Sequence, residues 1–189
     1  MTKSILLVGV GGQGTILASK ILTTGLMEAG YDVKMSEIHG MSQRGGSVSS
    51  QVRYGDRVAS PVINEGGADM LVAFEKMEAL RYIGFLKKDG TAVVNDFEIP
   101  SIPVITGDET YAPDILEEIQ KHVSAKVVNA AELANGLGNA KVANMILLGT
   151  IIKIMDLTKI DWEGIVRSTV KPQFVEINLK ALQTGMDAV

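Results

Sequence analysis

A glycine-rich turn, Gly9-Val-Gly11-Gly12-Gln13-Gly14, stands between an apolar run and an amphipathic segment near the start of the chain. The run from Ile5 to Val10 is typical of a strand that is buried on both faces. From Thr15 to Ala29, apolar residues recur at three- and four-residue steps, which predicts a helix, and Gly30 stands where that helix should end. A strand, a glycine turn and a helix in this order predict the opening of a Rossmann-like fold.

The rest of the 189-residue chain continues the alternation of strands and helices. Further strands are predicted at Tyr31–Met35, Asp69–Phe74, Thr91–Asn95, Ile102–Ile105 and Ala125–Val128. Further helices are predicted at Lys76–Leu86, from Pro113 to Val123, after the capping sequence Asn129–Glu132, at Val142–Met155, near Trp162 and after Pro172. This order favours right-handed crossovers and a mainly parallel sheet. We therefore expect one α/β domain over residues 1–189, a Rossmann-like three-layer fold that ends in helices.

The segment Ser36–Gly66, which follows the second strand, interrupts this pattern. It holds five glycines, three of the five arginines and no lysine, and it is too long for an ordinary connection between a strand and a helix. Ser47–Tyr54 has the spacing of a strand inside it. The sequence predicts a Gly/Arg-rich insertion here, either a functional loop or an additional hairpin.

The glycine turn contains the spacing G-x-G-x-x-G, which suits a ligand phosphate held at the start of a helix. Gly9, Gly11, Gly12, Gln13 and Gly14 are therefore candidate contact residues, and Thr15 could add a hydroxyl. A dinucleotide would also require an acidic residue at the end of the second strand, and the nearby candidate, Glu37, lies past the expected end. The alternative is that the glycines make a tight turn beside another subunit.

The second candidate site is the stretch from His39 to Ser47, in which an arginine stands beside two glycines. A guanidinium on such an exposed backbone can grip a carboxylate or a phosphate with two hydrogen bonds. The candidate contact residues are His39, Gly40, Ser42, Gln43, Arg44, Gly45, Gly46 and Ser47. If the second strand lies beside the glycine turn, both loops meet at the carboxyl ends of the strands. The alternative is a solvated loop with Arg44 in a surface ion pair.

Several functions are disfavoured by what the sequence lacks. With no cysteine and two histidines, the chain offers no thiolate for an iron–sulfur cluster and no metal motif. The net charge of −4 disfavours nucleic-acid binding, and no segment has the length of a membrane span or signal peptide, so a cytoplasmic location is expected. No catalytic constellation is visible. Glu75 and Glu78 are expected on a solvated helix face.

These motifs together resemble one family. Gly9–Gly14 followed by Ala18, and Arg44-Gly45-Gly46 followed by Arg53, are similar to the gamma domain of pyruvate/ketoisovalerate-type 2-oxoacid:ferredoxin oxidoreductases. The longer form Glu37–Ser47 resembles the small subunit of the indolepyruvate type. The later matching residues are Ser60, Pro61, Asp69, Asn144, Met145, Gly149, Asn178, Ala181 and Gly185.

The resemblance implies a non-redox subunit that is inactive alone. Thiamine diphosphate, magnesium and 4Fe-4S clusters would belong to a large partner subunit, which passes electrons to ferredoxin, and coenzyme A would be a co-substrate. An aryl pyruvate is the implied 2-oxoacid, with pyruvate, 2-oxoglutarate and branched-chain oxoacids as alternatives. The chain itself would complete the assembly, shield the active site or help to bind coenzyme A. A free-standing nucleotide-binding module, a scaffold without a ligand, and a homodimer of the isolated chain stay open.

Overall fold

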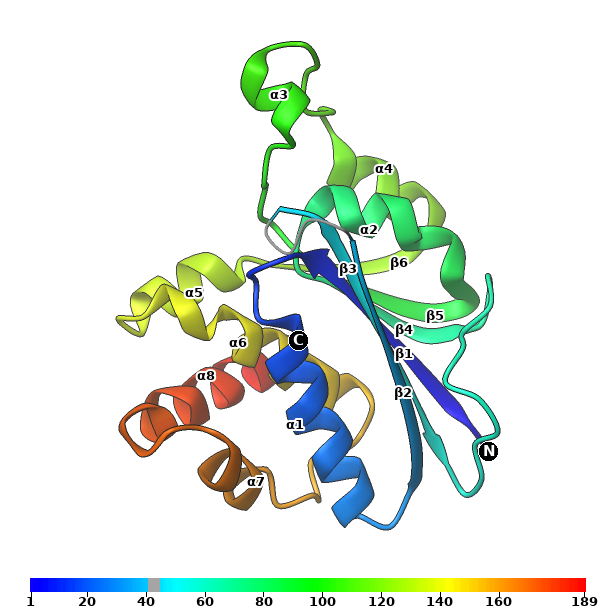
Figure 1. Ribbon diagram of the computed structural model, residues 1–189, viewed down its shortest axis with the longest axis vertical. Coiled ribbons are helices and arrows are strands. Elements are labelled where there is room, and N and C mark those ends of the chain that lie inside the picture. The colour runs from blue at the N-terminus through cyan, green and yellow to red at the C-terminus, as the bar shows by residue number, and fades with distance from the viewer. Residues whose placement is uncertain (41–44) are drawn as a thin grey trace.

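The protein is a three-layer α/β structure in which helices cover both faces of a twisted sheet (Figure 1). A computed structural model describes residues 1–40 and 45–189. Within these residues the strands are β1 (Lys3–Val10), β2 (Asp32–His39), β3 (Ser47–Gly55), β4 (Ala68–Ala73), β5 (Leu86–Asn95) and β6 (Ser124–Val128). The predicted Rossmann-like fold class is confirmed.

The strand order across the sheet is β2-β3-β1-β4-β5-β6. Strands β1, β4, β5 and β6 run parallel to one another, and β3 is antiparallel to both of its neighbours, β1 and β2. The sheet is therefore mainly parallel, as predicted. Of the two structures predicted for the Gly/Arg-rich insertion, a functional loop or an additional hairpin, the hairpin is found. Its strand β3 lies between β1 and β2 in the sheet.

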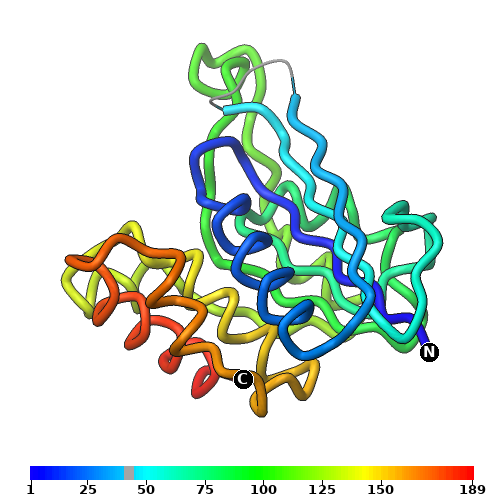
Figure 2. The backbone as a smooth tube through the Cα atoms, turned by 60° about the horizontal axis from the view of Figure 1, so that its bottom comes forward, coloured from blue at the N-terminus to red at the C-terminus, as the bar shows by residue number. Residues whose placement is uncertain are grey.

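The helices are divided between the two faces of the sheet (Figures 1 and 2). One face carries α1 (Thr15–Glu28), α5 (Ala130–Gly136), α6 (Ala143–Ile154), α7 (Trp162–Thr169) and α8 (Val175–Asp187). The other face carries α2 (Lys76–Tyr82) and α4 (Ile115–His122), and the short α3 (Ile102–Thr106) projects from the body. Three short 3-10 turns, η1 (Ile83–Phe85), η2 (Ala140–Val142) and η3 (Pro172–Phe174), precede β5, α6 and α8.

Strand alternation gives the sheet two hydrophobic cores. In β1, Ile5 and Leu7 pack with α1 and the C-terminal helices, whereas Leu6 and Val8 pack with α2 and α4. All four side chains are at most 1% exposed. This is why β1 is apolar without interruption rather than alternating between apolar and polar residues.

Helices α6 and α8 lie against each other at unusually short range. A Cβ atom on Gly185 would overlap the carbonyl oxygen of Ile146, and one on Gly149 would overlap that of Leu182. Residues 144–152 of α6 are buried throughout, which confirms the predicted buried helix. In the part of the chain that the structure describes, no helix combines the length and the apolar character needed to cross a bilayer.

Two local predictions were wrong. The segment Ile102–Ile105, predicted as a strand, is helical, because Pro103 begins a helical turn on a projection that no strand flanks. The second strand continues to His39 instead of ending near Met35. The condition that it lies beside the glycine turn is not met, since β3 separates it from β1.

Candidate functional site

The glycine turn joins β1 to α1 with two residues in the left-handed region. Gly12 has φ 103° and Gly14 has φ 80°, values that side chains other than glycine rarely adopt. Gly14 is also the N-cap residue of α1, so it has no side chain that could accept a hydrogen bond from the first N–H groups of the helix. Those N–H groups have no partner within the helix and favour an anion.

Gln13 ties the turn to the neighbouring strand. Its Oε1 accepts from the Val10 N–H at 2.7 Å, and its Nε2 donates to the Phe74 carbonyl oxygen at 2.8 Å. The Asn95 Nδ2 donates to the same carbonyl at 3.0 Å. These bonds join the carboxyl ends of β1, β4 and β5, where the chain switches from helices on one face to helices on the other. Open α/β sheets bind ligands at such points, and here Gln13 links β1 and β4 through its two hydrogen bonds.

Gly14 lets the turn pack closely against α6. A Cβ atom there would lie 2.7 Å from the Nδ2 of Asn144, which donates to the Gly14 carbonyl oxygen at 3.2 Å. Asn144 is buried, and nothing in the sequence marked it as a partner of residue 14 beyond its membership of the family pattern. The third glycine of the motif therefore serves close packing against a helix that is 130 residues away in the sequence.

The second candidate stretch, His39–Ser47, is called the Gly/Arg-rich loop below, and its end meets the glycine turn. The strand that lies next to β1 and makes this contact possible is β3, not β2. The Gly40 N–H donates to the Ser47 carbonyl at 3.0 Å and closes the neck of the loop, while the Gly11 N–H donates to the Gly46 carbonyl at 2.9 Å. Ser42, Gln43 and Arg44, predicted as contact residues, lie outside the described residues, as does Met41.

Two buried carboxylates stand beside this neck. Glu75 and Glu78 are 1% and 2% exposed, so the predicted solvated face was wrong. The Ser47 hydroxyl donates to Glu78, which also accepts from the Arg81 guanidinium at 2.6 Å. The prediction failed because α2 is only seven residues long and its first turn faces the sheet. The spacing of residues in so short a helix does not show which face is buried.

The glycine turn forms a wall between two cavities. The first has a volume of about 510 Å³ and is lined by Gly11, Gly12, Gly14, Thr15, Ile16, His39 and Val48. The second, of about 550 Å³, lies toward α5 and α6 and takes Gln13, Phe97, Lys141 and Asn144 into its lining together with Gly12 and Gly14. The first cavity brings the start of α1 together with residues from both loops that the sequence selected, so it is the candidate site.

The geometry disfavours a dinucleotide in this cavity. Glu37, the candidate for a ribose contact, lies inside β2, and β3 separates that strand from the glycine turn. Its carboxylate accepts from the Ser19 hydroxyl at 2.9 Å and lies 3.8 Å from His39 Nε2. The Gly11 N–H, at the position where a pyrophosphate would approach, is bonded to Gly46.

No metal centre is found among residues 1–40 and 45–189, which contain no cluster of three or more histidine, aspartate or glutamate side chains suited to an ion. With no cysteine in the sequence, the chain holds no thiolate ligand either. The paired glycine motifs and the hairpin within the sheet thus define a Rossmann-like α/β domain whose site suits an anionic ligand or another protein chain.

Comparison with known proteins identifies the family. The chain belongs to the pyruvate ferredoxin/flavodoxin oxidoreductase family, whose sequence profile matches residues 4–188. It is 40% identical over 191 residues to the indolepyruvate oxidoreductase subunit IorB of Archaeoglobus fulgidus, covering 98% of this chain and 94% of that protein. It is 38% identical over 193 residues to IorB of Pyrococcus horikoshii, covering 98% and 95%. The gamma subunit of a keto/oxoacid ferredoxin oxidoreductase from Geobacter sulfurreducens has the same fold, with a TM-score of 0.73, 25% identity and coverage of 98% and 97%.

Proposed function

We propose that the chain is the non-redox small subunit of an indolepyruvate, or aryl pyruvate, ferredoxin oxidoreductase that works in the cytoplasm. The observation that carries this proposal is the similarity over nearly the whole chain to IorB subunits, at 38% and 40% identity. The Glu37–Ser47 motif supports the same subtype. Pyruvate, 2-oxoglutarate and branched-chain oxoacids are the alternative substrates.

The residues of this chain do not fit the redox cofactors of such a complex. Without cysteine it cannot ligate 4Fe-4S clusters, and it has no G-D-G…N-N segment of the kind that holds thiamine diphosphate and magnesium. We therefore assign these groups, the decarboxylation and the transfer of electrons to ferredoxin to a large partner subunit. The small subunit is expected to be inactive alone.

We assign the 510 Å³ cavity to phosphate groups of coenzyme A, the co-substrate that accepts the acyl group. Its volume falls within the range of about 300–1,000 Å³ that is usual for small-molecule sites. The start of α1 favours an anion, and Thr15 adds a hydroxyl at the cavity wall. Arg44 would supply the guanidinium, because His39, before it, lines the cavity, and Gly46, after it, is bonded to the cavity residue Gly11.

The subunit assignment is tested by anaerobic affinity purification of the tagged chain from its native host. The expected result is a large protein with ferredoxin-like cysteine motifs in a fixed ratio, and dye reduction by the complex that requires indolepyruvate and coenzyme A. The same assay with other 2-oxoacids ranks the alternative substrates. A chain that purifies alone, and is stabilised against heat by NAD or FMN, would instead be a nucleotide-binding module.

The role of Arg44 is tested in the intact complex by Arg44→Ala. Losing a bidentate contact to a phosphate should weaken coenzyme A at least about tenfold, while the KM for the 2-oxoacid stays unchanged. Arg57→Ala is the matched control, since Arg57 is an exposed arginine beyond the far end of β3. An unchanged KM for coenzyme A in Arg44→Ala would remove this residue from the site.

A further inference from the structure

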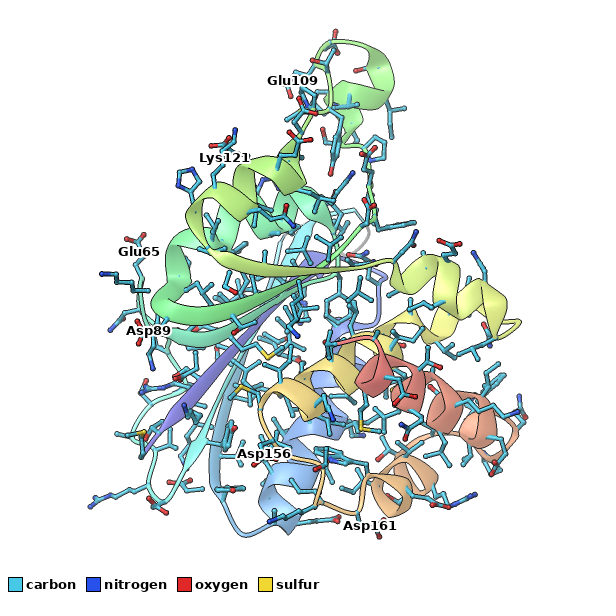
Figure 3. The ribbon with its side chains drawn as sticks, turned by 180° about the vertical axis from the view of Figure 1, so that it is seen from behind. Glu65, Asp89, Glu109, Lys121, Asp156 and Asp161 are labelled. Carbon is cyan, nitrogen blue, oxygen red and sulfur yellow. The ribbon has the colours of Figure 1, made fainter. Side chains whose placement is uncertain are left out.

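A projecting segment between β5 and α4, residues 98–111, stands apart from the body of the protein (Figures 1 and 2). We call it the arm. It carries α3, and in Figure 3 Glu109 lies on this projection, beyond Lys121 of α4. The arm adds no strand to the sheet, so the fold of the sheet does not explain its presence.

The arm exposes two isoleucines close together. Ile102 is 77% exposed and Ile105 is 72% exposed, more than any other large apolar side chain of the described residues apart from Met1. They are three residues apart on one short helix, so they share a face. Paired apolar side chains at the end of a projection are typical of a surface that another molecule covers.

The arm is anchored at both ends by one buried carboxylate. Glu75 accepts from the Ile99 N–H at 3.2 Å and from the Tyr111 hydroxyl, and it also caps α2 by accepting from the Glu78 N–H at 2.9 Å. Burial and the bond to Glu75 raise the pKa of Tyr111, so its hydroxyl stays a donor. The projection is therefore a positioned element rather than a loose loop.

The sequence around the two isoleucines is acidic. From Glu98 to Glu118 the sequence contains six acidic residues and no lysine or arginine. Among the described residues, ion pairs involve Glu98 and Glu118, while the other four take part in none. These four are Asp108, Glu109, Asp114 and Glu117. A complementary surface would be an apolar depression bordered by basic side chains.

We propose that the arm docks into such a basic-rimmed apolar depression on the large subunit of the oxidoreductase, an inference that rests on the proposed function. The root of the arm supports this location. Ser101 and Val104 share a hollow of about 110 Å³ with Gly45 and Glu78, beside the neck of the Gly/Arg-rich loop. Docking the arm places the partner next to that loop.

The test is the double variant Ile102→Ser/Ile105→Ser, co-expressed with the large subunit under anaerobic conditions. The matched control is Met27→Ser/Val62→Ser, which also replaces two exposed apolar side chains, 55% and 54% exposed, elsewhere on the surface. Both variants should keep the wild-type melting temperature. We expect the arm variant to bind the large subunit at least about tenfold more weakly, and the control to bind like wild type.

The outcomes distinguish a failure of the docking proposal from a failure of the proposed function. If wild type and the arm variant bind the large subunit equally, the arm is not the docking element, although the proposed function stands. If wild type itself binds no large subunit, both proposals fail. If gel filtration of the isolated chain shows a dimer that the arm variant loses, the occupant is a second copy, and the docking proposal is overturned.

Discussion

Replacing Gly14 by alanine tests whether the glycine turn is held by its contact with α6. Two costs add at this position. An alanine at φ 80° is strained by about 1–2 kcal/mol. Its Cβ would lie 2.7 Å from Asn144 Nδ2, so the amide must move and give up its 3.2 Å bond to the Gly14 carbonyl, a further loss of about 0.5–1.5 kcal/mol.

The control is Gly12→Ala in the same turn. Gly12 also has a positive φ, 103°, but a Cβ atom there meets nothing within 4 Å. It should therefore cost only the backbone strain of about 1–2 kcal/mol. Gly14→Ala should lower the free energy of unfolding by about 2–3 kcal/mol, roughly 1 kcal/mol more than Gly12→Ala.

Urea unfolding of the full-length chain measures both values, and Asn144→Ala completes the comparison. Because the Asn144→Ala variant has already lost the amide, the extra cost of Gly14→Ala over Gly12→Ala should disappear in that background. Equal costs of the two glycine substitutions in the wild-type background would refute the reasoning. A difference that persists without the Asn144 amide would place the extra cost elsewhere.

Gly185→Ala should destabilise the chain by about 1–3 kcal/mol or more, because its Cβ meets the fixed carbonyl of Ile146 and forces α6 and α8 apart. Thermal unfolding against Gly136→Ala, where a Cβ meets nothing, checks this, and equal melting temperatures would contradict it. Burial alone would raise the pKa of Asp69, but hydrogen bonds from Lys87 and the Ser4 N–H lower it below 3.8. The ionised carboxylate therefore stabilises the fold above that pH, and this stabilisation is lost as the pH falls toward the folded pKa. Asp69→Asn should thus cost about 1 kcal/mol near neutral pH, and the gap to wild type should close below about pH 4; a gap constant with pH in urea titrations would oppose the assignment.

The periodic elements of this fold were predictable from the sequence. The helix after Gly14 and the capping sequence at Asn129, whose side chain accepts from the Glu132 N–H, depend on local spacing, and both formed as expected. The insertion of β3 between β1 and β2 was not predictable, because pairing order depends on contacts between residues up to 51 positions apart. The helix at Ile102 was missed because four apolar residues fit either structure.

The site was predictable in part. The sequence selected the two glycine loops, and the structure places Gly11 against Gly46. The sequence did not reveal the contact of Asn144, which reaches the turn from a distant helix, or the burial of Glu75 and Glu78. A carboxylate that caps a short helix looks like a solvated one until the residues that cover it are known.

The position of β3 has a consequence for how the chain assembles. β2 and β3 form a hairpin whose pairs start at His39 and Val48, only nine residues apart, whereas β1 must join β3 through pairs 37 to 51 residues apart. Loop-closure entropy favours the near pairing, so the hairpin should form first and then add to β1 as a unit. Its closed end carries the neck of the Gly/Arg-rich loop, and the glycine turn meets that neck only when β1 has paired. The side of the cavity that His39 and Val48 line is thus formed before the side that the glycine turn lines.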